Sequence, residues 1–230
     1  MDIGVGYFGG LGNQLFQLNF AIRLAKFYKR KVALIKHDFN PRSDRAYELE
    51  KLVLKTNNLS DFVFVHPETS TSLLSSGNWQ LKFEKKEFQP FQSEKIDGSS
   101  NVCFIGHYQH HRLVKANKEV IITSLLDFTS RIQFRKIELN FKEDFAAIHV
   151  RRGDLLEKRC EGMGLVSPRS FESIIRSIPS FWNRYVFTDD LQNGSEATAT
   201  MEISRILGPE DTNIWESFSL MANASHKPII

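Results

Sequence analysis

The chain opens with a short apolar segment, a glycine-rich turn and a long helical pattern, and this opening limits the fold more than any other feature. Ile3 and Val5 precede the sequence GYFGGLGNQLFQ, residues 6–17, and residues 31–35 read as a β strand. Strand, turn, helix and strand in this order predict a parallel α/β layer. The glycine turn then lies at the carboxyl end of a strand, where such sheets bind ligands. The apolar residues that recur at helical spacing between the two strands are Leu15, Leu18, Ile22 and Ala25, with Phe16, Phe20, Leu24 and Phe27 beside them.

The rest of the chain continues this alternation and divides into two α/β halves, residues 1–138 and 139–230. The first half is expected to contain a helix over 46–54, an apolar run at 62–65, a Ser/Thr-rich loop at 69–77, a strand over 102–108 and a polar helical segment ending near 141. The second half is expected to contain a strand over 145–150, a helix that begins at Ser167 and Pro168, a strand over 182–187, a helix with Ile214, Phe218 and Met221 on one face, and the start of a strand at 227–230.

Composition excludes several classes of protein. The formal net charge is +3, and the 30 Lys and Arg are spread among 27 Asp and Glu, which gives nucleic-acid binding no support. Cys103 and Cys160 lie far apart in no metal or redox spacing, and we interpret them as buried thiols in a reducing compartment. No apolar run is long enough for a membrane span, and no signal peptide is recognisable, so a soluble, cytoplasmic protein is expected.

Charged residues directly follow the strand predicted at 145–150. They are His149, Arg151, Arg152 and Asp154. Arginines at a strand's carboxyl end can hold phosphate oxygens bidentately, and a neighbouring carboxylate can fix a guanidinium. A surface turn with an internal Arg–Asp ion pair is the alternative. The adjacent arginines and the histidine favour a phosphate site.

Asp189 and Asp190 end the next predicted strand, and in a parallel sheet they fall on the same edge as Arg151. Paired carboxylates there can bind a ribose or base, orient the arginines or hold a metal. A helix N-cap explains an Asp at a strand-to-helix turn equally well.

Two other patterns carry weaker hypotheses. His107, His110 and His111 fall within five residues, but without an accompanying carboxylate or cysteine, so a metal site is disfavoured. Gly4, Gly6 and Gly9 have the G-x-G-x-x-G spacing of a dinucleotide-binding turn. Only three residues precede Gly4 and the second strand ends without an acidic residue, so a nicotinamide cofactor is disfavoured too.

Three motifs in order, GGLGNQLFQ, HVRRGD and FTDD, together resemble the glycosyltransferase family 11 α-1,2-fucosyltransferases, especially bacterial members. Further similarity comes from AYELEKLVL at 46–54, GHYQ at 106–109 and WESFSLMANASH at 215–226, so the resemblance extends across essentially the whole chain. It implies a GT-B-like fold of two Rossmann-like halves with parallel sheets. It also implies inverting transfer of L-fucose from GDP-fucose to O-2 of a terminal β-galactoside, a galactoside 2-alpha-L-fucosyltransferase activity, in O-antigen or lipopolysaccharide biosynthesis.

The resemblance assigns residue roles. Arg151 would hold the donor diphosphate, and Asn13 with Gly10 and Gly12 would bring the N-terminal, acceptor-side half to the sugar and diphosphate. The family implies no cofactor and no required metal, and it leaves room for peripheral association at the inner membrane. The other residues it places at the donor are His149, Arg152, Asp154, Thr188, Asp189, Asp190 and Gln14.

The chain departs from the family at its C-terminal end. Members continue beyond the equivalent of 227–230 with an Ala-Asn-Ser-Ser-Phe-Ser-Trp-Trp-like motif that lines the donor pocket, and with closing helices. The donor-side half is therefore expected to be incomplete. The alternative function is a non-catalytic remnant that binds GDP or a glycan.

Overall fold

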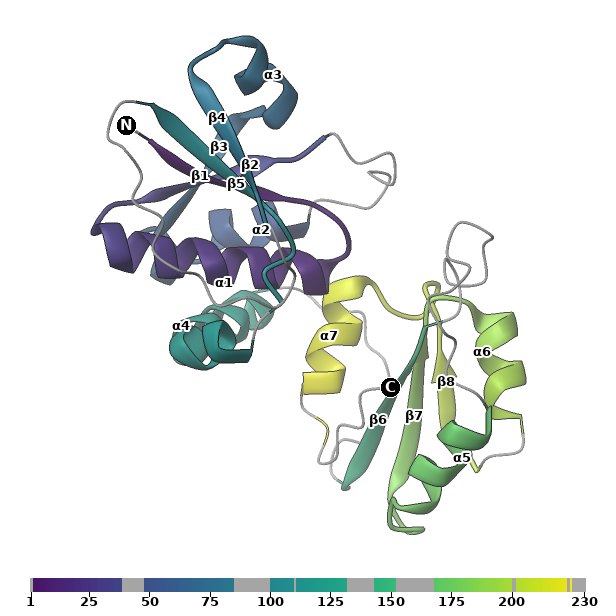
Figure 1. The fold of residues 1–230 in the computed structure, drawn as a ribbon. Coiled ribbons are helices and arrows are strands. Elements are labelled where there is room, and N and C mark those ends of the chain that lie inside the picture. Colours follow the sequence, from purple (N-terminus) through teal and green to yellow (C-terminus); the bar gives the residue numbers. More distant parts are fainter. Residues whose placement is uncertain are drawn as a thin grey trace. The chain divides into compact units, whose positions relative to one another are not determined.

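The protein is described from a computed structural model, in which the chain divides into two compact units, 1–132 and 133–230. Each unit is an α/β fold with one parallel sheet, as the alternating pattern predicts (Figure 1). The described residues are 2–38, 48–84, 100–109, 111–131, 143–151, 168–199, 202–222 and 224.

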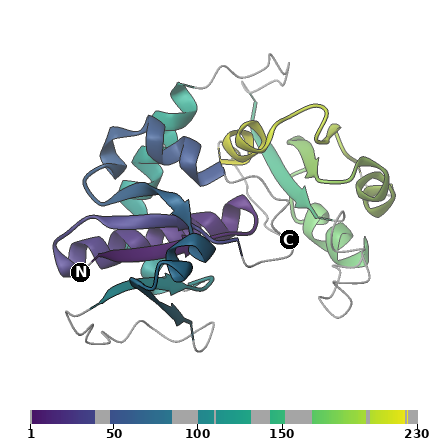
Figure 2. The ribbon, with the colours of Figure 1, turned by 90° about the horizontal axis from the view of Figure 1, so that it is seen from above.

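Unit 1 is built on a five-stranded parallel sheet of order β3-β2-β1-β5-β4. Helices α1, α2 and α4 lie on one face of this sheet and α3 on the other (Figures 1 and 2). Its elements are β1 (Ile3–Tyr7), α1 (Leu11–Tyr28), β2 (Val32–Lys36), α2 (Glu48–Lys55), the 3₁₀ turn η1 (Asn57–Leu59), β3 (Val63–Thr69), α3 (Ser70–Ser75), β4 (Trp79–Phe83), β5 (Asn101–Ile105) and α4 (His111–Ser130).

Two of the N-terminal glycines are explained by packing inside the sheet. Gly4 and Gly6 lie in β1, on the face covered by α3, and not in the turn that follows. A Cβ at Gly4 would overlap the side chain of Ile35, and one at Gly6 would overlap Ile105. Glycine is therefore favoured here, because the side chains of the two neighbouring strands close over β1 and would have to shift to admit a Cβ. The G-x-G spacing has a packing cause at these positions.

Unit 2 is built on a three-stranded parallel sheet of order β6-β7-β8 among the described residues. Ala146, Ile148 and Val150 pack with Ile175 and Val186 on one face. Leu220 and Met221 pack on the other face, against a cluster that includes strand residues 145 and 147. The elements are β6 (Phe145–Val150), α5 (Pro168–Arg176), β7 (Asn183–Thr188), α6 (Leu191–Thr198), β8 (Arg205–Leu207) and α7 (Ile214–Ala222).

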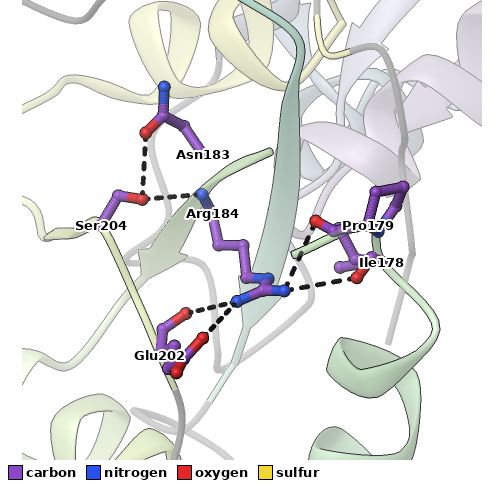
Figure 3. Close-up of polar contacts among 6 residues, drawn as sticks. All are labelled: Ile178, Pro179, Asn183, Arg184, Glu202 and Ser204. Atoms are coloured by element: carbon purple, nitrogen blue, oxygen red, sulfur yellow. Dashed lines mark hydrogen bonds and ion pairs between the residues drawn. The ribbon is translucent and has the colours of Figure 1, made fainter. Parts of the chain in front are cut away.

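A buried arginine joins three segments at the amino edge of this sheet (Figure 3). The Arg184 side chain is 8% exposed. Its Nη2 donates to the carbonyl oxygen of Ile178 at 3.3 Å and to that of Pro179 at 3.5 Å, after α5. Its Nη1 donates to the carbonyl and carboxylate oxygens of Glu202, both at 3.3 Å. Arg184 therefore ties the end of α5 to the segment before β8.

The structure corrects two parts of the predicted element list. The Ser/Thr-rich segment expected to be a loop contains helix α3, whose N-cap Thr69 accepts a hydrogen bond from the Ser72 backbone N–H at 3.4 Å. Ser and Thr have modest helix propensity, but this cap and the burial of Leu73 favour a short helix. Elements β4, α6 and β8 were not predicted. The strand expected at 227–230 lies outside the described residues.

Cys103 is buried, as predicted, and burial raises the pKa of its thiol to about 12. Cys160 lies outside the described residues. No helix among the described residues is long and apolar enough to span a bilayer.

Candidate functional site

The glycine turn precedes α1 at the carboxyl edge of the unit 1 sheet. Gly9 has a φ of +75°, a conformation that favours glycine. Gly10 is the N-cap of α1 and supplies no side chain to bond the first-turn amides. A Cβ at Gly12 would meet no atom of the described residues within 4 Å. An approaching anion or hydroxyl group would therefore meet backbone N–H groups that a helix cannot satisfy internally.

Two buried glutamines hold this turn in place, and both are fully buried. Gln14 donates to the Gly9 carbonyl oxygen at 2.7 Å and accepts from the Leu49 N–H at 2.9 Å. Gln14 was expected at the donor, yet its amide is engaged at both ends within the protein. Gln17 accepts from the Phe8 N–H at 3.0 Å and donates to the Gly106 carbonyl oxygen, also at 3.0 Å. The turn is therefore fixed before any ligand arrives.

Asn13 lies where the chain changes direction across the sheet. The connection after β1 leads to β2 on one side, whereas the strand on its other side is β5, so the carboxyl ends of β1 and β5 form a topological switch point. The Asn13 Oδ1 accepts a hydrogen bond from the Gln109 Nε2 at 2.7 Å, which joins the two loops that flank this point. Parallel α/β sheets bind their ligands at such positions.

Acidic and imidazole groups line the same edge of the sheet. Glu84 follows β4 and accepts hydrogen bonds from the backbone N–H groups of His107 at 2.9 Å and Tyr108 at 3.1 Å. The Phe8 ring lies between two imidazoles, 5.2 Å from His37 and 5.0 Å from His107 between ring centroids. This edge therefore combines an aromatic ring and imidazoles with the glycine turn.

His37 and Asp38 are joined through a serine of α3. The Ser70 Oγ donates to the Asp38 carboxylate at 2.8 Å and lies 2.9 Å from the His37 Nδ1. Because the serine has one proton to donate, His37 Nδ1 must carry a hydrogen in this arrangement. Burial lowers the pKa of His37, and the charge of Asp38 opposes this effect. Burial alone would raise the pKa of Asp38, but hydrogen bonds from Thr69, Thr71 and Ser70 outweigh it and hold the pKa well below its ordinary value.

In unit 2 the predicted cationic group lies at the carboxyl edge of the sheet. Val150 pairs with Thr188 in the parallel register of β6 and β7, so Arg151 and Asp189 follow the two strands at equivalent positions. Both are exposed, whereas Thr188 is buried. Burial lowers the pKa of His149. The charge of Asp189 raises this pKa and the charge of Arg151 lowers it, so both charged groups interact electrostatically with His149. The structure thus brings three of the predicted residues together.

Asp190 caps a helix. Its carboxylate accepts from the Asn193 backbone N–H at 3.1 Å and from the Asn193 side chain at 2.6 Å, at the start of α6. These hydrogen bonds lower the pKa of Asp190. Of the two roles considered for an Asp at this turn, the helix cap is the one that the geometry shows for Asp190. Asp189 is the carboxylate that faces outward.

Other predicted residues lie outside the part of the structure that is described. They include Arg152 and Asp154. Of the three clustered histidines, His110 and the side chain of His111 are not described. Within the described ranges no three His, Cys, Asp or Glu side chains cluster as a metal site.

Sequence reasoning did not select the buried amide of Gln17, the exposed amide of Gln109 or the carboxylate of Glu84 as site residues. A glutamine within an apolar helical pattern, such as Gln17, was the available signal, because a buried amide needs partners. Comparison with protein-family models, curated proteins and solved structures finds no match to this chain.

Proposed function

We propose that the protein is an inverting glycosyltransferase that transfers L-fucose from GDP-fucose to O-2 of a terminal β-galactoside, in the cytoplasm of a bacterium that assembles surface glycans. The observation that carries the proposal is the exposed Arg151 at the carboxyl edge of a parallel sheet, level with Asp189 and next to His149. The ordered motifs of the sequence support it as well. On this proposal unit 1 is the acceptor half and unit 2 the donor half of a GT-B-like enzyme.

Arg151 has the charge that the reaction needs. As the glycosidic bond of GDP-fucose breaks, negative charge grows on the departing diphosphate. A fixed guanidinium stabilises that charge more in the transition state than in the ground state, and this difference raises the rate. Asp189 would hold the guanidinium in orientation, and a charge supplied by arginine removes the need for a metal ion.

The glycine turn would serve the other end of the reaction. The backbone N–H groups at the start of α1 can donate to sugar hydroxyls or to the diphosphate. Asn13, held by Gln109, offers an amide at the switch point for the same purpose. Because Gln14 and Gln17 have already fixed the turn, little ordering entropy would be lost on binding.

The test is calorimetric titration of the full chain with GDP, followed by a transfer assay with GDP-fucose and a β-galactoside. Arg151→Ala should weaken GDP binding by roughly 10- to 100-fold, since hydrogen bonds to charged groups contribute about 1.5–3 kcal/mol. Arg176→Ala is the matched control, because Arg176 is exposed in the same unit and pairs with Glu172 on α5.

Loss of GDP binding in Arg151→Ala alone would support the donor site, and equal affinities of both variants would contradict it. Binding of GDP by the wild type without any transfer would make the protein a GDP-binding relative of such enzymes, in place of an active one. A folded wild type that does not bind GDP would refute the proposal.

A further inference from the structure

Positive charge is concentrated in the N-terminal part of unit 1. Residues 3–37 contain six of the chain's 30 Lys and Arg and none of its 27 Asp and Glu. The remainder of the chain therefore carries three more acidic than basic residues. The net charge of +3 does not show this asymmetry, because it is the sum of a cationic segment and an acidic remainder.

Five of these six basic residues lie around the C-terminal end of α1. This end is at the amino edge of the sheet, since α1 runs back from the end of β1 to the start of β2. Residues 23, 26, 27 and 30 follow the spacing of one helix face. We call the exposed group at this end the basic end of α1. It comprises Arg23, Lys26, Phe27, Lys29, Arg30 and Lys31.

An aromatic side chain is exposed among these charges. Phe27 is 55% exposed and contacts the Tyr28 ring edge-on, with 4.9 Å between centroids. It is one of the apolar residues that recur at helical spacing in this helix, and Leu24 and Ala25 beside it are buried. An exposed phenylalanine flanked by lysines and arginines is typical of a helix surface that lies against an anionic lipid interface, where the ring enters the headgroup boundary and the cations meet phosphates.

Neighbouring elements leave the surface cationic. Lys26 is held by a hydrogen bond to Asn117 at 2.9 Å and lies over the Phe62 ring. The turn before β3 brings Asp61 to the same edge, because the Val32 N–H donates to the Phe62 carbonyl oxygen. Exposed Asp2, which directly precedes β1, lies at this amino edge as well. Two carboxylates do not offset the five basic side chains of the basic end of α1.

We propose that the basic end of α1 is a docking surface for an anionic lipid bilayer. Phe27 inserts at the headgroup boundary, and the basic residues bind lipid phosphates around it. The glycine turn lies at the opposite end of α1, whose 18 residues correspond to roughly 27 Å, so the proposed docking surface does not include the glycine turn. This inference does not depend on fucosyl transfer, because it concerns a different edge of the sheet.

The test is co-sedimentation of the full chain with vesicles of phosphatidylcholine, with and without phosphatidylglycerol. Wild type should bind only the vesicles that contain phosphatidylglycerol, and salt should release it as the Debye length falls from about 10 Å at 0.1 M to about 3 Å at 1 M. The triple variant Arg23→Gln, Arg30→Gln, Lys31→Gln should partition on the order of 100-fold more weakly, at about fivefold per basic residue.

A control variant removes the same charge elsewhere. Lys51→Gln, Arg176→Gln, Arg205→Gln also lowers the net charge from +3 to 0, and each of these residues is exposed and forms an ion pair. It should bind vesicles within a fewfold of wild type. A third variant, Phe27→Ser, keeps all charges and should bind about tenfold more weakly through the lost apolar contact.

Each outcome bears on the proposal. Selective loss in the first triple variant and in Phe27→Ser, with unchanged thermal unfolding, would support it. Equal loss in both triple variants would show attraction by net charge alone and would overturn it. A wild type that ignores the vesicles but binds RNA would assign the surface to nucleic acid and overturn it as well. GDP titration of the same variants keeps this result separate from the donor site.

Discussion

Replacing Arg184 by methionine tests which contacts of this buried arginine stabilise unit 2. The guanidinium donates to three carbonyl oxygens, those of Ile178, Pro179 and Glu202, at 3.3–3.5 Å. Methionine fills a similar volume but removes the donor to the carbonyl oxygens of Ile178 and Glu202, whereas that of Pro179 still accepts from the Trp182 N–H at 3.1 Å. Hydrogen bonds to a charged donor contribute about 1.5–3 kcal/mol at good geometry, and these are long, so about 1 kcal/mol each is appropriate.

The expected destabilisation of unit 2 is therefore about 2–3 kcal/mol. It is smaller than the sum for strong bonds, because methionine also relieves the cost of burying a cation whose Nε has no acceptor in the described structure. The ion pair itself should contribute little. The Glu202 side chain is 89% exposed, so Glu202→Gln should cost less than about 1 kcal/mol.

The assay is urea unfolding followed by tryptophan fluorescence in a Trp79→Phe background. Trp79 lies in unit 1, whereas Trp182 and Trp215 lie in unit 2, so the remaining signal reports on unit 2 alone. The midpoint should fall in Arg184→Met with an unchanged denaturant slope. If Glu202→Gln were as damaging as Arg184→Met, the carbonyl contacts would not be the source of stability, and the reasoning would be refuted.

Three further predictions concern unit 1. Gly9→Ala should destabilise unit 1 by about 1–2 kcal/mol, because φ is positive at Gly9. The loss should exceed that of Gly77→Ala: φ is positive at both glycines, but only the Cβ at Gly9 would lie 2.9 Å from the Asn13 Nδ2. Urea unfolding of the two variants measures the difference. Gln17→Leu removes the partner of the buried Phe8 N–H and of the half-buried Gly106 carbonyl oxygen, and should cost about 2–4 kcal/mol. Faster amide hydrogen exchange in the glycine turn is its expected signature. In the folded protein the pKa of Asp38 lies below its ordinary value of about 3.9, so the ionised carboxylate stabilises the fold above that pH and this stabilisation is lost as the pH falls. Asp38→Asn should therefore make the free energy of unfolding less dependent on pH in the acid range. An unchanged pH dependence would contradict this assignment.

The sequence predicted the parts of the fold that depend on local pattern. The run Phe145–Val150 is apolar except for His149, and a strand buried on both faces needs a mainly apolar composition, so β6 was readily predicted. The same holds for α1, whose apolar residues recur over several turns. The α/β class and the parallel sheets follow from the order of such segments.

The elements that were missed depend on contacts distant in the chain. Strand β8 has three residues and an exposed first position, and it exists because it pairs with Tyr185, Val186 and Phe187 of β7. Helix α6 begins at the Asp190 cap, but its Gly194 would have been taken for a breaker. That glycine is required because a Cβ there would come 2.6 Å from the Thr188 Oγ1. Neither cause can be read from a local window of sequence.

The N-terminal glycines show why one spacing pattern was difficult to interpret. Gly4 and Gly6 are small because Ile35 and Ile105 of the adjacent strands close over β1, whereas Gly9 is glycine because its φ is positive. The G-x-G-x-x-G spacing therefore joins two unrelated physical requirements, one of sheet packing and one of turn geometry. A dinucleotide fingerprint needs its first glycine in the turn, since that residue sets the turn and lets the pyrophosphate approach. With Gly4 and Gly6 inside the strand, the residues left to meet a ligand are Gly10, Gly12 and Asn13, which is the set that the proposed sugar-nucleotide chemistry uses.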